Sequence, residues 1–398
     1  MIGGGPAGLS FARSLADTEL EILVVERSPL DQLRAPAQDG REIALTHRSI
    51  ETLKDLGVWS RIPPDEISPI RKAEVLDGDS SYSLSFDRSS LTVDALGYLV
   101  SNHLIRKALC EEVETAANVE LLTGVTVTNL STSPSGAAVV LSNGETVEAS
   151  LVVAADSRIS DARRKMGIPA SMHDFSRVAV VCRMKHDLPH YGTAFECFHY
   201  ERTLAVLPMS GQRSSIVITA PTHAASEIMG MSEQTFNIDV QQRFRNRFGQ
   251  MILEGKRYAY PLVAVYADRF AATRFALVGD AAVGMHPVTA HGFNLGLRGQ
   301  ATLASEIKTA LTLGKDIAGA SVLNNYQSKH QRVTRPLYLA TNAIVGLFTN
   351  DAPPIKLVRK LVLRLGNSFP PVKRMVTQGL AETDTQWSLF RSLLPRPH

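Results

Sequence analysis

The spacing of apolar residues divides the chain into short runs of strand length and longer segments of helical period. Near the start, a glycine-rich turn over 3–8 is followed by apolar residues on one helical face: Leu9, Ala12, Leu15 and Ala16. A strand over Leu20–Val25 then ends at Glu26. A turn, a helix and a strand in this order predict the βαβ unit of a doubly wound nucleotide-binding sheet.

The same pattern predicts the elements that follow. Helices are expected over Ser49–Leu56 (ending at Gly57), Asn102–Val113 and 232–248. Strands are expected over Ala73–Leu76, Tyr82–Phe86, Glu120–Leu130, Ala137–Leu141 and Thr146–Val153, with a hairpin turn at Asn143-Gly144. Alternation over 175–220 predicts a sheet that forms a floor under the functional site, built from Val178–Cys182, Ala194–Tyr200, Thr203–Leu207 and Ser215–Thr219. Everything after about Thr302 is expected to be helical.

Composition narrows the class of protein. At 398 residues, with 44% hydrophobic and 20% charged residues, the chain is long enough for two domains. Its net charge of +3 is too small to indicate nucleic-acid binding. Cys110, Cys182 and Cys197 form no CxxC pair and no metal-ligand spacing, so we expect buried thiols in a reducing compartment and no metal site. No apolar run reaches the roughly 18–20 residues that cross a bilayer, and we expect no signal peptide.

The glycine-rich turn reads GGGPAG and fits the pattern GxGxxG. Gly3, Gly5 and Gly8 let the backbone approach a pyrophosphate at the N-terminus of the following helix. Glu26, at the end of the next strand, is placed to accept hydrogen bonds from ribose hydroxyls. The alternative, a glycine turn between packed elements, does not account for this carboxylate. Since only two residues precede the turn, we expect a truncated first strand and a weakened centre of the sheet.

A second stretch of chemical interest is FALVGDAAVGMHPVTAHGFNLGLRGQ, residues 275–300. An apolar strand over Phe275–Val278 stops at Gly279-Asp280, and a helix begins near Gly292. A strand that ends in Gly-Asp and leads into a helix places a carboxylate and helix N–H groups close together. This arrangement suits a ligand that carries hydroxyl groups and an anionic or electron-accepting end.

Two further positions have both a structural and a functional interpretation. Asp156 ends the buried strand 151–155, and it either caps the helix that holds Arg163 or lies as an acid beside the nucleotide site. Arg41 either contacts ligand phosphates or is a surface arginine. The pattern of the residues leaves both choices open.

Three motifs therefore stand in order: GGGPAG…VVER, VVAADSRISDAR and ALVGDAAVGMHPVTAHGFNLG. Together they resemble the FAD-dependent aromatic hydroxylases of the para-hydroxybenzoate hydroxylase type, and most of all the ubiquinone-biosynthesis ring hydroxylases. The resemblance runs from Gly3 to about Gly379 and implies an α/β fold. A Rossmann-like FAD-binding domain with a truncated first strand then carries an inserted β-sheet substrate domain and a C-terminal helical region. The implied division is 1–70, 101–170 and 270–345 for the FAD-binding domain, 71–100 and 171–269 for the substrate domain, and 346–398 for the helical region.

The resemblance also implies roles for individual residues. The implied cofactor-binding residues are Gly3, Gly5, Gly8, Glu26, Arg27, Arg41, Asp156, Gly279, Asp280, Gly292, Phe293 and Asn294. Among them, Asp280 is expected to hold the ribityl hydroxyls, and the helix that starts at Gly292 is expected to aim at the pyrimidine end of the flavin. Pro287 is expected to lie over the flavin ring.

The chain departs from the family pattern at three places. Ala154-Ala155-Asp156-Ser157 replaces the usual G-A-D-G, Val283 stands where a histidine commonly follows GDAA, and Ala290-His291-Gly292 replaces G-Q-G. The lost glycine is expected to stiffen the loop that touches the flavin. His291 becomes a candidate catalytic residue beside Pro287, as a hydrogen-bond donor near the reacting oxygen. The alternative is a structural or solvent-facing imidazole.

By the same resemblance, the reaction is hydroxylation by O2 of the aromatic ring of a polyprenylated phenol or quinol in ubiquinone biosynthesis, through a flavin C4a-hydroperoxide. The cofactor supplies such chemistry, while the protein supplies position and a dry pocket. The chain has no second GxGxxG, so either NAD(P)H binds transiently or another donor delivers the electrons. Other quinone-biosynthesis proteins are candidate partners.

The segment 355–365, IKLVRKLVLRL, has a basic amphipathic pattern. One helical face carries Leu357, Val358, Leu361, Val362 and Leu365, and the other carries Lys356, Arg359, Lys360 and Arg364. Such a helix lies on an anionic membrane surface or docks a partner, or it is an ordinary packed helix with a solvated basic face. We therefore expect a cytoplasmic protein with a candidate peripheral contact to the inner face of the membrane.

Two other classes of function remain open at this point. The first is another FAD enzyme, such as a prenyl reductase or an amine-type oxidase. A flavin halogenase is disfavoured because Trp59 and Trp387 stand in no W-x-W-x-I-P motif. The second is a non-catalytic scaffold of a quinone-biosynthesis complex, suggested by the short first strand and the substituted glycines.

Overall fold

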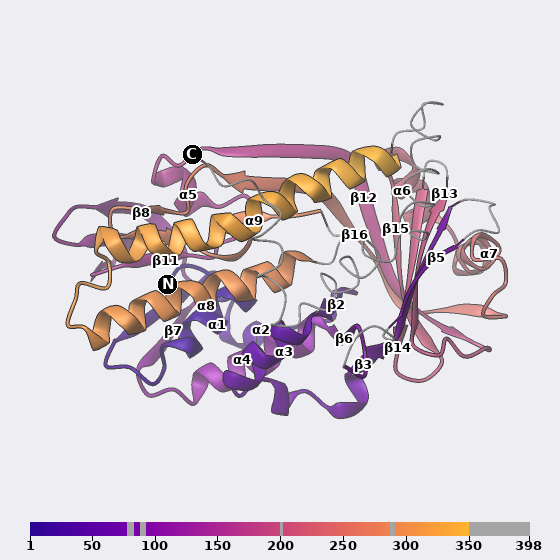
Figure 1. The fold of residues 1–398 in the computed structure, drawn as a ribbon, viewed down its shortest axis with the longest axis horizontal. Helices are drawn as coiled ribbons and strands as arrows, with labels where there is room; N and C mark the ends of the chain where they lie inside the picture. The colour runs from indigo at the N-terminus through magenta and orange to yellow at the C-terminus, as the bar shows by residue number, and fades with distance from the viewer. Residues whose placement is uncertain (78–82, 88–92, 200–201, 287–290, 350–398) are drawn as a thin grey trace.

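The computed structural model describes residues 1–77, 83–87, 93–199, 202–286 and 291–349. Figure 1 shows helices packed around a parallel sheet on one side of the molecule and a large twisted sheet on the other. The helices are α1 (Pro6–Ser14), α2 (Leu30–Arg34), α3 (His47–Asp55), α4 (Asn102–Glu114), α5 (Asp161–Lys165), α6 (Thr222–Gly230), α7 (Glu233–Arg243), α8 (His291–Thr312) and α9 (Ala320–Thr349). Short 3₁₀ turns are η1 (Trp59–Arg61), η2 (Pro64–Glu66) and η4 (Gly279–Ala281).

The central sheet is parallel except at one edge. Its strands, in order across the sheet, are β7 (Val119–Thr123), β1 (Ile22–Glu26), β11 (Val152–Ala154), β18 (Phe275–Leu277) and the antiparallel β17 (Ala271–Ala272). Ile2 joins the two halves through parallel bridges to Val25 and Ala154. The expected first strand is therefore represented by a single bridging residue at the centre of the sheet.

Two small antiparallel sheets flank this centre. One has the order β2 (Glu42–Leu45), β6 (Gly97–Ser101), β3 (Ser68–Ile70), and the other has the order β10 (Thr146–Ala149), β9 (Ala137–Leu141), β8 (Val127–Thr132). The division into domains stays a prediction. Residues 97–100, which it gives to the substrate domain, pair with β2 and β3 and make no strand of the large sheet.

The large sheet has eight strands among the described residues. Their order is β19 (Val283–Gly284), β16 (Met251–Ala267), β12 (Ala170–His186), β15 (Arg213–Pro221), β14 (Arg202–Met209), β13 (Thr193–His199), β4 (Lys72–Asp77) and β5 (Ser83–Asp87). Helices α6 and α7 cover its outer face, where Phe236 and Val240 are fully buried against Val180, Ile216 and Cys197. The opposite, inner face is turned toward the parallel sheet (Figure 1).

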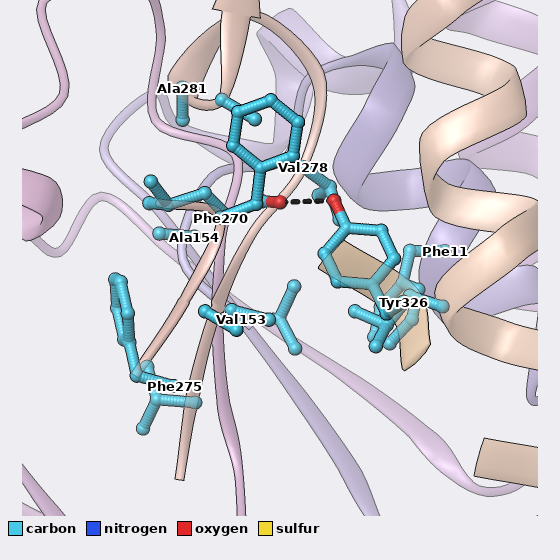
Figure 2. Close-up of a cluster of buried hydrophobic side chains, with 14 of the residues drawn as sticks. Phe11, Val153, Ala154, Phe270, Phe275, Val278, Ala281 and Tyr326 are labelled. Atoms are coloured by element: carbon cyan, nitrogen blue, oxygen red, sulfur yellow. Dashed lines mark hydrogen bonds between the residues drawn. The ribbon is translucent and has the colours of Figure 1, made fainter. Parts of the chain in front are cut away.

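The core of the half that contains the parallel sheet lies between that sheet and α8 and α9. Phe270, Phe275 and Tyr326 are fully buried there with Phe11 and Val153 (Figure 2). The Tyr326 hydroxyl donates a hydrogen bond to the carbonyl oxygen of Leu277 at the end of β18. This contact ties α9 to the strand that leads into the Gly279-Asp280 turn.

The observed elements confirm the expected α/β class, and most differ from their predicted bounds by a few residues. The single strands expected over Glu120–Leu130 and Thr146–Val153 are wrong, because each is two strands in different sheets: β7 and β8, and β10 and β11. Gly57 has φ +77° after α3, and Gly144 has φ +89° in the β9–β10 hairpin, as the turn patterns predict. Cys110, Cys182 and Cys197 are buried free thiols. The expectation of continuous helix after Thr302 is wrong at 313–319, a loop with Gly314 at φ +61°. Pro287 and the segment 355–365 lie outside the described residues.

Candidate functional site

The strand ends of the parallel sheet bring the three motifs together. The Gly3 N–H donates to the Val25 carbonyl, the Ile2 N–H donates to Val153, and the Val278 N–H donates to Ala154, each over 2.8–2.9 Å. Parallel strands end at the same edge of a sheet, so the glycine turn, Glu26, Asp156 and the Gly279-Asp280 turn line one edge. In open α/β sheets this carboxyl edge is where ligands bind.

The glycine turn is tight, and it leaves the start of α1 open. Gly3 has φ +100°, and a Cβ at Gly8 would lie 2.0 Å from the Gly3 carbonyl oxygen. A Cβ at Gly5 would meet nothing within 4 Å. Pro6 is the first helical residue of α1, and no side chain caps the helix. Gly3 and Gly8 therefore shape the turn, while Gly5 borders the space where an anion is favoured.

Glu26 lies beside the turn. Its Oε2 accepts a hydrogen bond from the Gly4 N–H at 2.6 Å, and its Oε1 accepts one from the Ser28 N–H at 2.9 Å. The two N–H groups fix the carboxylate at the end of β1, which is the place expected for a ribose-binding acid. Arg27, the next residue, is exposed.

The Gly279-Asp280 turn packs directly on the first motif. Gly279 has φ +60°, and a Cβ there would lie 2.7 Å from the Ala7 Cβ in α1. The half-exposed Asp280 carboxylate accepts from Arg158 at 3.0 Å, and Arg158 also donates to the Val263 carbonyl of β16. Asp280 therefore lies where the parallel sheet, α1 and the large sheet meet.

Helix α8 starts beside β2. Asn294 is buried, its Nδ2 donates to the Ala44 carbonyl at 2.9 Å, and its Oδ1 accepts from the Thr46 N–H at 3.1 Å. Asn294 therefore sets the position of the helix N-terminus. Phe293 packs on the apolar cluster around α3 and α4, and a Cβ at Gly292 would meet nothing within 4 Å. His291, partly buried, is the first helical residue.

The structure favours the capping interpretation of Asp156. Its Oδ1 accepts from the Ser160 hydroxyl at 2.5 Å, and its Oδ2 accepts from the Ala162 N–H at 3.0 Å. The side chain thus holds the start of α5. Its backbone still borders the site, because a Cβ at Gly3 would lie 3.2 Å from the Asp156 nitrogen.

Arg41 is an exposed residue on the inner side of the large sheet. Its guanidinium pairs with Asp39 at 2.6 Å and lies 5.4 Å from the centre of the Tyr260 ring. Burial raises the pKa of Asp39, but hydrogen bonds from Arg41 outweigh it, so the net shift is downward. Arg41 is therefore held by this pair, and its contact with a cofactor stays a prediction.

The sequence assigns no role to Arg158, Arg163 and Arg183, which tie distant segments together near the site. Buried Arg163 donates to the carbonyls of Arg158 and Ala281, and burial lowers its pKa. Arg183 of β12 pairs with Glu42 of β2 at 2.7 Å. Burial raises the pKa of Glu42 more than Arg183 lowers it. The contacts of Arg163 with Ala281 and of Arg183 with Glu42 connect segments more than a hundred residues apart, so no local pattern reveals them.

Comparison with known families indicates which ligand binds at this edge of the sheet. The model of the FAD-binding domain family matches residues 1–339. The chain belongs to this FAD-binding family. It is 48% identical to ubiquinone hydroxylase UbiM of Neisseria meningitidis, covering 96% of this chain and 83% of that protein. It is 32% identical to ubiquinone hydroxylase UbiL of Rhodospirillum rubrum, covering 94% and 87% respectively.

Solved structures of other proteins share the fold of this chain. p-Nitrophenol 4-monooxygenase PnpA of Pseudomonas putida aligns with a TM-score of 0.77 at 18% identity, covering 96% of this chain and 97% of that one. PqsL of Pseudomonas aeruginosa in complex with 2-aminobenzoylacetate aligns with a TM-score of 0.73 at 18% identity, covering 96% and 98%. At this level of identity the likeness concerns the fold alone.

The residues at the carboxyl edge fit FAD. The uncapped start of α1 suits a pyrophosphate, and the Glu26 carboxylate at the end of β1 suits ribose hydroxyls. Asp280, in the turn that packs on α1, offers a second carboxylate that can accept hydrogen bonds from hydroxyl groups. The role of each named residue stays a prediction that binding measurements can test.

We expect Asp280→Ala to weaken FAD binding roughly tenfold or more, since a hydrogen bond to a charged group contributes about 1.5–3 kcal/mol. Asp161→Ala is the matched control, because Asp161 is an exposed carboxylate that pairs with Arg164 and Lys165 on α5. FAD titration of the apoprotein, followed by flavin fluorescence, measures both. Equal dissociation constants for the two variants would exclude this role for Asp280.

Proposed function

We propose that this protein is an FAD-dependent monooxygenase that hydroxylates the aromatic ring of a polyprenylated phenol or quinol in ubiquinone biosynthesis. One observation carries the proposal: the 48% identity to a ubiquinone hydroxylase across 96% of the chain. The 3-demethoxyubiquinol 3-hydroxylase of Escherichia coli, 26% identical over 94% of this chain, points to the same substrate class. The substrates that we infer are therefore a prenylated aromatic ring and O2.

The arrangement of the two sheets supports a ring-hydroxylating site. The FAD-binding edge meets the large sheet at Arg158, which contacts both Asp280 and β16. The inner face of that sheet carries apolar residues such as Val181 and Leu262. An apolar wall beside the cofactor suits an aromatic ring with an isoprenoid tail and limits the access of water.

Bound FAD supplies the redox chemistry with O2, and the chain supplies position and charge. Asn294 fixes the start of α8. The N–H groups at this helix N-terminus favour negative charge nearby. The catalytic roles expected for Pro287 and His291, the route of oxygen to the ring and the use of NAD(P)H as reductant stay predictions.

The membrane contact also remains part of the proposal. No helix in the described part of the chain is long and apolar enough to cross a bilayer. The basic segment 355–365 is the candidate for peripheral contact, with a cytoplasmic location and other quinone-biosynthesis proteins as candidate partners. Flotation with anionic liposomes tests the contact.

Complementation tests the function directly. We expect the gene to restore ubiquinone in at least one of a set of bacterial strains that each lack one ring hydroxylation, with intermediates identified by mass. The Gly8→Val variant, in which the Cβ would meet the Gly3 carbonyl, serves as the inactive control. Failure in every strain, despite soluble and FAD-loaded protein, would contradict the proposal and favour another flavoenzyme. Purified protein without FAD would instead favour a scaffold.

A further inference from the structure

Glu196 brings a carboxyl group to the inner face of the large sheet. Glu196 lies in β13 between Phe195 and Cys197, which both pack on the outer face against α7. Side chains alternate between the two faces of a strand, so Glu196 points to the inner face. No described residue forms a hydrogen bond or an ion pair with its carboxylate.

The register places Glu196 in a row that crosses the sheet. From one side to the other the row is Tyr258, Val181, Val217, Ala205, Glu196, Val75 and Leu84. Glu196 is the one ionisable carboxyl group in this aromatic and aliphatic row. A Cβ at Gly40, next to Arg41, would lie 2.6 Å from the Tyr258 ring. The row therefore begins where the large sheet meets the FAD-binding half.

The contacts of its neighbours show which way this face is turned. Ala194, two residues before Glu196, packs with Ile70 and Leu99, which belong to the small sheet beside the parallel sheet. Arg183, on the same face of β12, pairs with Glu42 of that small sheet. By these contacts, Glu196 faces the FAD-binding half, on the side where the substrate is expected.

This face is only partly covered. Along β13 and β14 the outer residues Phe195, Cys197 and Val206 are buried, whereas Glu196 and Ala205 keep some exposure. Strand positions with small and aliphatic side chains, open on one side, form a surface that accepts an aromatic ring or an isoprenoid tail. A carboxyl group on such a surface is available to a ligand.

No described charge offsets the burial of this group. The neighbours on β4 and β14 present Val75, Ala205 and Thr203. Two nearby ion pairs lie on the outer face: Glu74, opposite Phe195, is bonded to Lys72, and Arg202 is paired with Asp239 of α7. Burial alone raises the pKa of Glu196 to about 7. A base with such a pKa is well matched to proton transfer near neutral pH.

We propose that the Glu196 carboxylate accepts a hydrogen bond, and then the proton, from the ring hydroxyl of the phenolic substrate. The inference rests on the proposed function and names a substrate-contacting residue for it. The phenol O–H bond breaks as a new O–H bond forms on Glu196, and the electron pair stays on the phenolate oxygen. That electron density enriches the ring that is to be hydroxylated. The proton returns to the hydroxyl of the product, so no further reactant is needed.

Ligand binding tests the proposal without turnover. The probes are a 2-prenylphenol with a short isoprenoid chain and its methyl ether, which cannot donate a hydrogen bond. We expect the FAD-loaded wild-type protein to prefer the phenol at least about tenfold, and Glu196→Gln to lose that preference. Glu74→Gln is the matched control, because Glu74 lies on the neighbouring strand and faces outward. Flavin content and denaturation midpoint verify that each variant is folded.

Turnover supplies the second measurement. For the wild type we expect kcat/KM to rise with pH through about 7, because the carboxylate is the active form and it is present above the raised pKa. Glu196→Gln is expected to lose this rise and on the order of 10²-fold in kcat, with partial rescue by Glu196→Asp.

The two experiments separate the inference from the function on which it rests. If wild-type protein hydroxylates the phenol while Glu196→Gln keeps its pH profile and its preference for phenol over ether, the role of Glu196 is wrong and the function stands. If wild-type protein with FAD neither binds nor hydroxylates any prenylated phenol, the proposed function itself fails.

Discussion

Replacement of Gly8 by valine is expected to yield protein without FAD and with lowered stability. A Cβ at this position would lie 2.0 Å from the Gly3 carbonyl oxygen, which is backbone and cannot turn aside. The turn must therefore open. Opening it also disturbs the centre of the sheet, because the Gly3 N–H donates a hydrogen bond to the Val25 carbonyl there. We expect a cost of about 1–3 kcal/mol in folding free energy from overpacking. The ratio of flavin to protein absorbance should fall more than tenfold.

Gly5 provides the contrast that separates the cofactor from the fold. It has φ −76°, which alanine adopts easily, and its Cβ would enter open space. Gly5→Ala should cost under about 1 kcal/mol as a poorer helix cap. It should nevertheless weaken FAD binding, because the backbone there is where a pyrophosphate approaches closely.

Gly230→Ala is the control for both variants, since its Cβ also meets open space, at the end of α6 on the outer face of the large sheet. Urea denaturation and FAD titration of the three variants give the result. If Gly5→Ala lost stability as strongly as Gly8→Val and kept its affinity for FAD, the assignment of the turn would be wrong.

The sequence predicted what depends on neighbours along the chain. The glycine turn, the acid at the end of β1 and the Gly-Asp turn each carry a local pattern, and the parallel sheet then brings them to one edge. Turn glycines such as Gly57 and Gly144 were predicted for the same reason. Turns and strand ends of this kind can be predicted from the sequence because they constrain the backbone within a few residues.

What the sequence left open depends on contacts between distant segments. The sequence left open whether Asp156 caps a helix or faces the cofactor, and only the positions of Ser160 and Ala162 show that it caps α5. Arg158 lies within the second motif, yet nothing in that motif shows that it links Asp280 to β16 across more than a hundred residues. Glu196 was not singled out from the sequence, because its apolar surroundings are set by the residues that pair with it on β14 and β4. Side chains whose partners lie on distant segments leave no local pattern in the sequence.

The second large effect is expected at Tyr326, where replacement by alanine should destabilise the protein by about 3–5 kcal/mol, the usual cost of removing a buried large side chain. Tyr326 is fully buried, and its hydroxyl donates to the Leu277 carbonyl directly before the Gly279-Asp280 turn (Figure 2). Its ring stacks on His330, which lies against Gly299 of α8. The side chain thus joins α9, α8 and β18. Its loss is expected to loosen the turn that carries Asp280 and so to lower FAD affinity as well.

Tyr326→Phe separates the hydroxyl from the ring. It keeps the packing and removes one hydrogen bond, so the expected cost is about 1 kcal/mol with little loss of FAD. Tyr191→Ala is the surface control, because Tyr191 is 79% exposed and its loss should leave stability within about 0.5 kcal/mol. Denaturant midpoints, followed by circular dichroism and by flavin release in parallel, rank the three variants. A Tyr326→Ala protein as stable as the Tyr191→Ala control would mean that α9 does not secure the end of β18, and that the cofactor turn is held by α1 and Arg158 without it.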